Sequence, residues 1–346
     1  MDINKLSERF NNFAVIECKG SSPLYEALSL QIAIDTDMLR LSSYASEGQP
    51  VPNLFLGAVH YLLHKDKNHP LHEFYPSLVN EPKKPEGAFT EFKDFCEHNR
   101  KEIIQILQNK SVQTNEVRRC AYLYPVFCHI YKKIGTPLSL IEIGTSAGLQ
   151  LMWDQYSYSY GDDKVYGNKD SFLHLTASLR EGTTPQMLTN SPPVHSRLGL
   201  DLNIVDLNHE EEYLWLKALI WPEHKERLEI FQKAAVQIQH TPPTLVEGDG
   251  VELLTKYAEE VSSDSTICIF HTHVANQFPD RLKQKLFNQV KEIGEKRDIF
   301  HIYNNMRDRK LHLDYYIKGN EQNEVIGDTD GHGRWFDWNI AMSQEV

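Results

Sequence analysis

LSLIEIGTSAGLQLMWDQY, at residues 138–156, is the stretch on which the interpretation of this chain depends. An apolar run suited to a buried strand carries Glu142 near its end, and small residues then fill a turn from Gly144 to Gly148. The spacing that follows predicts a helix over 148–156. A strand, a glycine turn and a helix in this order commonly hold a nucleotide-like cofactor. The same letters spell Gly-x-Ser-x-Gly, the nucleophile elbow of serine hydrolases, with Ser146 at its centre.

Upstream of this stretch the chain has the hydrophobic spacing of helices. Apolar residues recur at intervals of three and four, and almost nothing alternates with period two. The spacing predicts helices at residues 4–13, 24–43, 54–65, 88–109 and 116–134. Gly135-Thr136-Pro137 then breaks the pattern. The sequence therefore predicts an all-helical N-terminal region over residues 1–135.

Downstream, short apolar runs alternate with helical patterns. Strands separated by helices are typical of βαβ units and a parallel sheet. The predicted strands are 138–143, 244–247, 266–270, 298–303, 311–317 and 323–327. We expect an α/β domain over residues 136–346, a Rossmann-like sheet of the methyltransferase type with helices on both faces. An irregular insertion is expected at about 157–206, and a long helix near 214–239 is broken at Trp221-Pro222.

Composition limits the classes of partner. The formal net charge is −12 and the chain has no long Lys/Arg run, so a nucleic acid is not an expected partner. No stretch approaches the roughly 20 apolar residues that span a bilayer, and the polar start does not resemble a signal peptide. Five scattered cysteines form no Cys-x-x-Cys pair. We expect a reduced cytoplasmic protein that acts on a small molecule, and the oligomeric state is left open.

The serine hydrolase interpretation needs more than the Gly-x-Ser-x-Gly letters. After Ser146 an acid and a histidine must follow, and Asp249 with His271, His273 or His332 could supply them. That fold also needs several strands before the elbow, where this sequence predicts helices. Ser146 therefore stays an alternative nucleophile.

The cofactor interpretation uses the same turn differently. Gly144 and Gly148 let the backbone approach a ligand closely, with the small residues Thr145 and Ser146 between them. The spacing Glu-x-Gly-x-x-x-Gly differs from the Gly-x-Gly-x-x-Gly of dinucleotide binders. It resembles the first motif of S-adenosylmethionine-dependent methyltransferases, in which an acid such as Glu142 ends the first strand. The alternative is a purely structural turn.

Two further acids are candidates for the same cofactor. Asp249 follows the predicted strand 244–247, where a carboxylate could accept a hydrogen bond from an adenine amine; it could equally be a helix N-cap. The acid that holds the ribose is expected about 20 residues after the glycine turn. Asp162 and Asp163 lie in a probable turn instead. Asp201 is the better candidate, although it comes more than 50 residues after Gly144.

The run Ile267-Cys268-Ile269-Phe270-His271-Thr272-His273 ends another predicted strand in polar residues. We expect His271 and His273 to act as the catalytic base or to contact substrate, because an ordinary imidazole titrates near neutral pH. Thr272 is expected to contact substrate. His-x-His can also bind zinc, but no third ligand stands at a recognisable spacing, and no metal site is predicted.

The sequence also resembles a bacterial family known as domain of unknown function 2332. The resemblance covers nearly the whole chain and is strongest in a set of short motifs. These are 22–25, 52–54, 59–62, 74–77, 142–149, 199–203 with Asp206, 218–223, 226–227, 270–272 and 331–335 with Trp338. It implies a member of the wider methyltransferase-like Rossmann group, and it draws attention to Trp221, His332 and Arg334 as substrate-binding candidates.

These observations lead to one expected function with two alternatives. We expect methyl transfer from S-adenosylmethionine to a small molecule. One alternative is a serine hydrolase that uses Ser146. The other is a non-catalytic ligand-binding protein with a degenerate Rossmann core.

Overall fold

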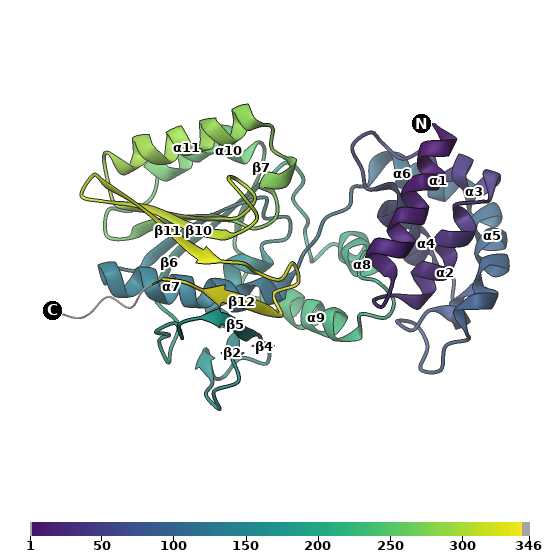
Figure 1. The fold of residues 1–346 in the computed structure, drawn as a ribbon, viewed down its shortest axis with the longest axis horizontal. Helices are drawn as coiled ribbons and strands as arrows, with labels where there is room; N and C mark the ends of the chain where they lie inside the picture. Colours follow the sequence, from purple (N-terminus) through teal and green to yellow (C-terminus); the bar gives the residue numbers. More distant parts are fainter. Residues whose placement is uncertain (1, 341–346) are drawn as a thin grey trace. The chain divides into compact units, whose positions relative to one another are not determined.

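The computed structural model describes residues 2–340, which form two compact units (Figure 1). The first runs through Thr114 and takes in Asn208–Glu229. The second comprises Asn115–Leu207 and the chain from Ile230 onward. The sequence placed the boundary near residue 135, whereas the structure places helix α7 (Cys120–Ile134) with the sheet of the second unit. Helix periodicity alone does not show which unit a helix belongs to.

The first unit is helical, as predicted. The predicted helices 24–43 and 88–109 are each divided in two. Its elements are α1 (Ile3–Asn12), η1 (Phe13–Cys18), α2 (Pro23–Ile32), α3 (Thr36–Ser42), α4 (Val51–Lys65), η2 (Pro70–Phe74), η3 (Pro85–Gly87), α5 (Ala88–His98), α6 (Arg100–Asn109), α8 (Glu210–Ala218) and the start of α9 (Lys225–His240). Within residues 2–340, no helix has both the length and the apolar character needed to cross a membrane.

Side-chain caps explain where the helices of this unit begin. The carboxylate of Asp35 accepts hydrogen bonds from the backbone N–H groups of Asp37 and Met38, both at 3.0 Å, and so starts α3. Ser22 is the N-cap of α2, where the Glu223 carboxylate also accepts from the N–H of Leu24 at 2.8 Å. These acceptors satisfy N–H groups that have no partner inside the helix.

The second unit is built on a seven-stranded sheet within the described residues. Its strands are β1 (Leu138–Ile143), β6 (Val194–Asp201), β7 (Thr244–Glu247), β8 (Thr266–His271), β9 (Ile299–Tyr303), β10 (Leu311–Ile317) and β11 (Asn320–Gly327). The order across the sheet is β11-β10-β9-β8-β1-β6-β7. Neighbouring strands among β7, β6, β1, β8 and β9 run parallel. β10 and β11 form an antiparallel hairpin at the edge of the sheet. The predicted α/β class with a mostly parallel sheet is therefore confirmed.

The strand order determines where a ligand can reach the sheet. Counted in chain order, the sheet reads 3-2-1-4-5-6-7, and its first five positions follow the order of a doubly wound fold. Connections leave β1 and β8 in opposite directions along the sheet. In such folds ligands bind outside the carboxyl ends of the strands, at this topological switch point.

Helices cover both faces of the sheet (Figure 1). On one face α10 (Gly250–Glu259) and α11 (Asp280–Gly294) bury leucine, valine and isoleucine side chains against β1, β6, β8 and β9. On the other face lies α7, whose Phe127 ring meets Phe270 of β8 edge-on at 5.6 Å. A strand that is covered on both faces of the sheet needs apolar side chains along its whole length. For this reason the sequences of the central strands are continuous apolar runs.

An insertion separates β1 from its neighbour β6. It contains β2 (Ser157–Ser159), β3 (Tyr166–Gly167), β4 (His174–Thr176) and β5 (Ser178–Gly182). β5 pairs with β12 (Trp335–Trp338) near the end of the chain. The predicted insertion at 157–206 was too long, because residues 194–201 form strand β6 in the centre of the sheet.

Candidate functional site

The glycine turn after β1 is held to the neighbouring strand. The N–H of Gly144 donates to the carbonyl of Leu200 at 2.8 Å, and the N–H of Ser146 donates to the Asp201 carboxylate at 2.8 Å. Gly144 and Gly148 have φ of +76° and +77°, a left-handed conformation that favours glycine. Several turn amides are thus already bound within the protein, so the turn offers fewer free donors than the sequence indicated.

The helix predicted over 148–156 is wrong in type. The segment is a 3-10 helix, η5 (Leu149–Gln155), and nearly all of its residues are buried. Within it, Trp153 stacks on Phe127 of α7 with ring centroids 4.3 Å apart. A short 3-10 helix has poorer hydrogen-bond geometry and a weaker dipole than a long α-helix. This segment therefore does not place the positive N-terminus of an α-helix next to the glycine turn.

The next residue is Asp201, the candidate for the acid that would hold the cofactor ribose. It is the last residue of β6, the strand next to β1, and the insertion accounts for its distance along the chain. Its carboxylate accepts from the N–H groups of Ser146 at 2.8 Å and Asn203 at 2.9 Å. Burial raises the pKa of Asp201, while the backbone hydrogen bonds oppose that shift. Asp201 both anchors the glycine turn and stands at the carboxyl edge of the second parallel strand.

Asp249 is the N-cap of α10. Its Oδ1 accepts from the N–H of Val251 at 2.9 Å and of Glu252 at 3.2 Å. The alternative interpretation of Asp249 as a helix N-cap is thus confirmed. These bonds involve only one carboxylate oxygen, so capping and ligand binding are compatible. A cofactor role for Asp249 stays a prediction.

A cavity of about 260 Å³ lies at the carboxyl ends of β1, β6 and β7. It brings together Gly144, Asp201 and Asp249, which the sequence proposed separately as cofactor contacts. Its other walls are mostly apolar and come from the strand ends, the start of α10 and the segment after β8. They are Ile143, Leu200, Leu202, Gly250, Val274, Gln277, Phe278, Pro279 and Leu282. Among residues 2–340, the only charged residues of its lining are the two aspartates.

Other predicted cofactor residues shape the turn and do not line this cavity. Glu142 is buried, and the Thr145 hydroxyl donates to its carboxylate at 2.6 Å. Burial raises the pKa of Glu142 to about 8, and the nearby Asp201 adds to the shift. A Cβ placed on Gly148 would lie 2.8 Å from Cγ of Pro243, so this glycine allows close packing within the protein. Direct contacts of Glu142, Thr145, Ser146 and Gly148 with a cofactor remain predictions.

A second group of polar residues, which we call the switch-point cluster, lies beyond the end of β8. It consists of Arg119, Thr272, His273, Gly331 and His332. The Arg119 guanidinium donates through Nε to the carbonyl of Gly331 at 2.9 Å and through Nη1 to the carbonyl of Thr272 at 3.4 Å. The structure thus brings together three of the predicted residues, Thr272, His273 and His332.

The cluster is connected to its surroundings by further polar contacts. The Thr272 hydroxyl donates to Oε1 of Gln150 at 3.0 Å, which links the end of β8 to η5. His332 pairs with the buried Glu116 at 2.8 Å. The predicted substrate residue Arg334 instead forms a two-point ion pair with Asp330, at 2.7 and 2.9 Å, and its own side chain is exposed.

His271 is placed differently from the expectation. It is fully buried on β8, and its Nε2 lies 3.1 Å from Nε2 of His301 on β9. Burial lowers the pKa of His271 to about 3, so the ring is neutral at physiological pH and a weak base. It does not line the cavity. This placement favours a structural histidine over a catalytic one.

His273 is more consistent than His271 with the expected contact to a substrate. Its backbone has φ of +58°, and its N–H donates to Oδ1 of Asn304 at 2.7 Å. Burial lowers the pKa of His273 to about 4, with Arg119 and His332 contributing. Its Nε2 is buried and has no hydrogen-bond partner among residues 2–340. Substrate contact by His273 remains a prediction.

Ser146 has neither the neighbours nor the fold of a hydrolase nucleophile. Its hydroxyl accepts from Nδ2 of Asn115 at 3.1 Å, and no histidine of the described chain hydrogen-bonds it. β1 is the first strand of residues 2–340, so no earlier strands extend the sheet as a hydrolase requires. The structure does not favour this alternative.

Trp221 belongs to the first unit and packs among aromatic rings there. Its indole Nε1 donates to Oδ1 of Asn53 at 3.1 Å, and its ring stacks on His224 at 5.3 Å. The predicted break between two helices at this point is confirmed, because α8 ends at Ala218 and α9 begins at Lys225. A role for Trp221 in substrate binding remains a prediction.

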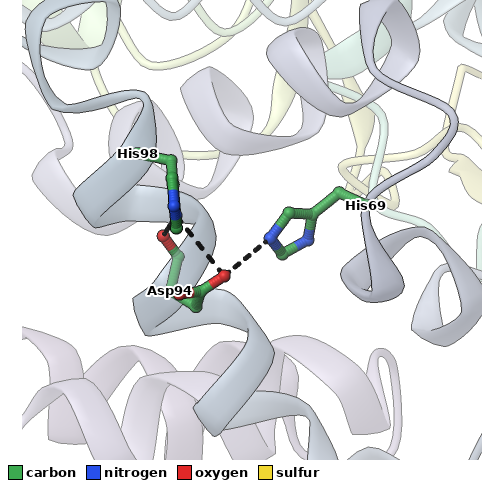
Figure 2. Close-up of side chains that lie close together, drawn as sticks. All are labelled: His69, Asp94 and His98. Carbon is green, nitrogen blue, oxygen red and sulfur yellow. Dashed lines mark hydrogen bonds and ion pairs between the residues drawn. The ribbon is translucent and has the colours of Figure 1, made fainter.

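His69, Asp94 and His98 form the one group of at least three metal-type ligands found in the described part of the chain (Figure 2). Nδ1 of His69 accepts from the N–H of Leu71 at 3.1 Å, so the proton of the neutral ring sits on Nε2 and is donated to Asp94 at 3.1 Å. Nδ1 of His98 lies 2.9 Å from the carbonyl of Asp94 and donates to it. Hydrogen bonding therefore explains this arrangement without a metal ion.

Sequence reasoning missed the Arg119 side chain. Arg119 looked like an ordinary residue of the helix predicted over 116–134, and its partner Gly331 is 212 residues away. The only available signal was its position just before a mostly apolar helix. Nothing in the spacing indicated that the last part of the chain returns to it.

No curated protein and no solved structure matches this chain. A family model does match, over residues 7–338, and its description is "Uncharacterized protein conserved in bacteria (DUF2332)". That span includes the cavity, the switch-point cluster and the helical unit. The chain therefore belongs to this bacterial family, the domain of unknown function 2332.

Proposed function

We propose that the protein is an S-adenosylmethionine-dependent methyltransferase that acts on a small molecule. The observation that carries the proposal is the cavity at the ends of β1, β6 and β7, where Gly144, Asp201 and Asp249 meet. In doubly wound sheets this edge is where nucleotide-like ligands bind. Bound S-adenosylmethionine would supply an electrophilic methyl group.

The chemistry of the cavity wall supports this ligand over a dinucleotide. Asp201 and Asp249 are its only charged residues, and their carboxylates repel a pyrophosphate. A pyrophosphate also needs the N-terminus of an α-helix, whereas a short 3-10 helix follows the turn. A ligand with ribose hydroxyls, an amine and a positive sulfonium suits two carboxylates. The apolar side chains, including Phe278 and Leu282, suit an adenine ring.

Each acid would have a distinct role. Asp201 has both oxygens near backbone N–H groups, yet each oxygen has a second lone pair for a ribose hydroxyl. Asp249 keeps Oδ2 available for the adenine amine while Oδ1 caps α10. The volume of about 260 Å³ falls slightly below the usual range of ligand pockets, so the cavity suits the nucleoside part of the cofactor.

The test is calorimetry of the full chain with S-adenosylmethionine and S-adenosylhomocysteine. We expect both to bind, and we expect Asp249→Ser to weaken binding by about 10- to 100-fold, the value of one hydrogen bond to a charged group. Serine still caps the helix, so the stability should hardly change, whereas Asp249→Ala should lose about 1 kcal/mol.

Asp35→Ser is the control for affinity, because Asp35 caps α3 in the other unit through the same pattern of hydrogen bonds, although it also loses an ion pair with Lys93. We expect it to leave both affinities unchanged. The absence of any heat with either ligand at millimolar concentration would contradict the proposed function. Binding that is unaffected in Asp249→Ser would place the ligand elsewhere.

A further inference from the structure

Arg119 is a buried cation without an acidic partner. Its side chain is only 5% exposed, and no Asp or Glu of residues 2–340 forms an ion pair with it. Its hydrogen bonds go to neutral oxygens, those of Gly331 and Thr272. A buried charge is costly unless an opposite charge or strong hydrogen bonds compensate for it. The arrangement therefore leaves a positive charge at the end of β8 that no ion pair within residues 2–340 neutralises.

The guanidinium also has donors to spare. Arginine carries five N–H donors in a planar fork. Nε and Nη1 make the hydrogen bonds described above, whereas Nη2 makes none within the described residues. A planar fork with free donors matches the two oxygens of a carboxylate or of a phosphate.

A second unsatisfied group lies at the same place. Nε2 of His273 is buried without a partner among residues 2–340. Its ring reaches Gly331, since Cε1 of His273 lies 3.9 Å from the position of a Cβ on that glycine. Arg119 donates to the carbonyl of the same Gly331. Two side chains from distant parts of the chain, each with an unsatisfied polar atom, thus lie beside the same glycine.

Two of the nearby acids are already committed to other cations. Asp330 forms its two-point ion pair with Arg334, and Glu116 pairs with His332. Glu142 is buried and accepts from Thr145. The charge of Arg119 acts on the Glu142 carboxyl from a distance, but among residues 2–340 no acid forms an ion pair with Arg119.

The position of these groups relates them to the proposed cofactor cavity. Thr272 and His273 directly follow β8, next to the switch point between β8 and β1. The next residue, Val274, lines the cavity, and its Cγ2 would lie 2.5 Å from a Cβ on Gly144. The switch-point cluster thus adjoins the cavity through consecutive residues.

We propose that Arg119 and His273 bind an oxyanion, a carboxylate or a phosphate, carried by the methyl acceptor. This inference rests on the proposed function, and it names the substrate class: a small acid and not a neutral or cationic amine. Arg119 supplies the charge and two donors, and Nε2 of His273 supplies a further hydrogen bond. The bound anion is held beside the cavity, so the acceptor is oriented toward the donated methyl group.

The experiment uses inorganic phosphate and malonate as separate probes with the full chain. Thermal unfolding is recorded as each probe replaces sodium chloride at constant ionic strength. We expect at least one probe to raise the unfolding midpoint of the wild type in a saturable manner. Which of the two is more effective distinguishes a phosphate from a carboxylate substrate.

Variants then locate the binding. Arg119→Lys keeps the positive charge for folding but loses the fork, and we expect its apparent dissociation constant to rise at least tenfold. His273→Gln keeps a hydrogen-bonding group and should weaken the response by a smaller factor. Arg309→Lys is the control, because Arg309 is exposed and this substitution, like Arg119→Lys, keeps the positive charge while it removes the planar fork. The inference is wrong if Arg119→Lys and His273→Gln respond as the wild type does, or if neither probe stabilises the wild type.

Calorimetry with S-adenosylhomocysteine on the same samples separates the two proposals. If the nucleoside binds and the anion response is absent, only the substrate class is wrong. If the anion response depends on Arg119 but no nucleoside binds, the proposed function fails while the anion site stands.

Discussion

Gly144→Ala is expected to lower the free energy of unfolding by about 2–5 kcal/mol. The residue has φ of +76°, which costs a residue with a Cβ about 1–2 kcal/mol. The added Cβ would also lie 2.5 Å from Cγ2 of Val274, and such overpacking costs about 1–3 kcal/mol. Urea denaturation measures the total.

Gly135→Ala provides the matched control for this prediction. Gly135 ends α7 with φ of +69°, and no atom of residues 2–340 lies within 4 Å of the position of its Cβ. It therefore shows the cost of the backbone conformation alone. Equal losses in both variants would contradict the packing argument. Adding Val274→Ala to Gly144→Ala should recover part of the loss, because it removes the closest atom.

This prediction also affects how binding experiments are designed. A bulky residue at Gly144 destabilises the whole second unit, so a loss of ligand binding there does not identify a contact. Asp249→Ser is the more informative change, because serine preserves the helix cap.

Removal of the buried histidine pair is expected to make the protein more resistant to acid. Burial lowers the folded-state pKa of His271 to about 3, and that of His301 is lowered as well, with His271 contributing. An unfolded histidine titrates at about 6.5, so the unfolded chain takes up protons first as the pH falls. The stability that the buried, neutral histidines contribute is fully present above pH about 6.5 and is lost progressively as the pH falls toward about 3.

The expected dependence of the unfolding free energy on pH is large because the pKa of His271 is far below its ordinary value. Each pKa unit corresponds to about 1.36 kcal/mol, so His271 alone accounts for a loss of several kcal/mol over this range. We expect the variant with both His271→Leu and His301→Leu to show a clearly shallower fall of unfolding free energy between pH 7 and pH about 4. A double substitution is needed, since a single one leaves the other Nε2 buried without its partner.

Urea denaturation at several pH values tests this expectation. The exposed His240→Gln is the control and should leave the slope against pH unchanged. An unchanged slope in the double variant would show that other groups dominate acid unfolding. Those groups would include His60, His64 and His273, whose pKa values are also lowered by burial.

The parallel sheet could be predicted because its strands are buried on both faces. β1, β8 and β9 are buried along their whole length, and their sequences are correspondingly continuous in apolar residues. β6 escaped recognition because polar residues interrupt its apolar character. Ser196 hydrogen-bonds Ser139 of β1, and Arg197 pairs with Asp154 of η5, so this strand satisfies its polar side chains through tertiary contacts.

The candidate site could be predicted in part for the same reason. Gly144 and Asp249 follow strands and Asp201 is the last residue of one, and parallel strands end at one edge, so their meeting in one cavity follows from the topology. The full burial of His271 could not be predicted, because the sequence of β8 does not show how far along the strand the burial extends. Arg119 could not be found at all, since its contacts are formed by a segment that follows it by 212 residues.

The docking of the last strand has a consequence for the order of folding during synthesis. A Cβ on Gly333 would lie 2.5 Å from the carbonyl of Arg118, so this loop presses closely on the start of α7. β12 then pairs with β5, and Arg180 joins Asp337 in a two-point ion pair. The helical unit is complete once Glu229 has left the ribosome, whereas Arg119 must wait for residue 331. The nascent chain therefore carries a finished helical unit well before its anion-binding groups are assembled.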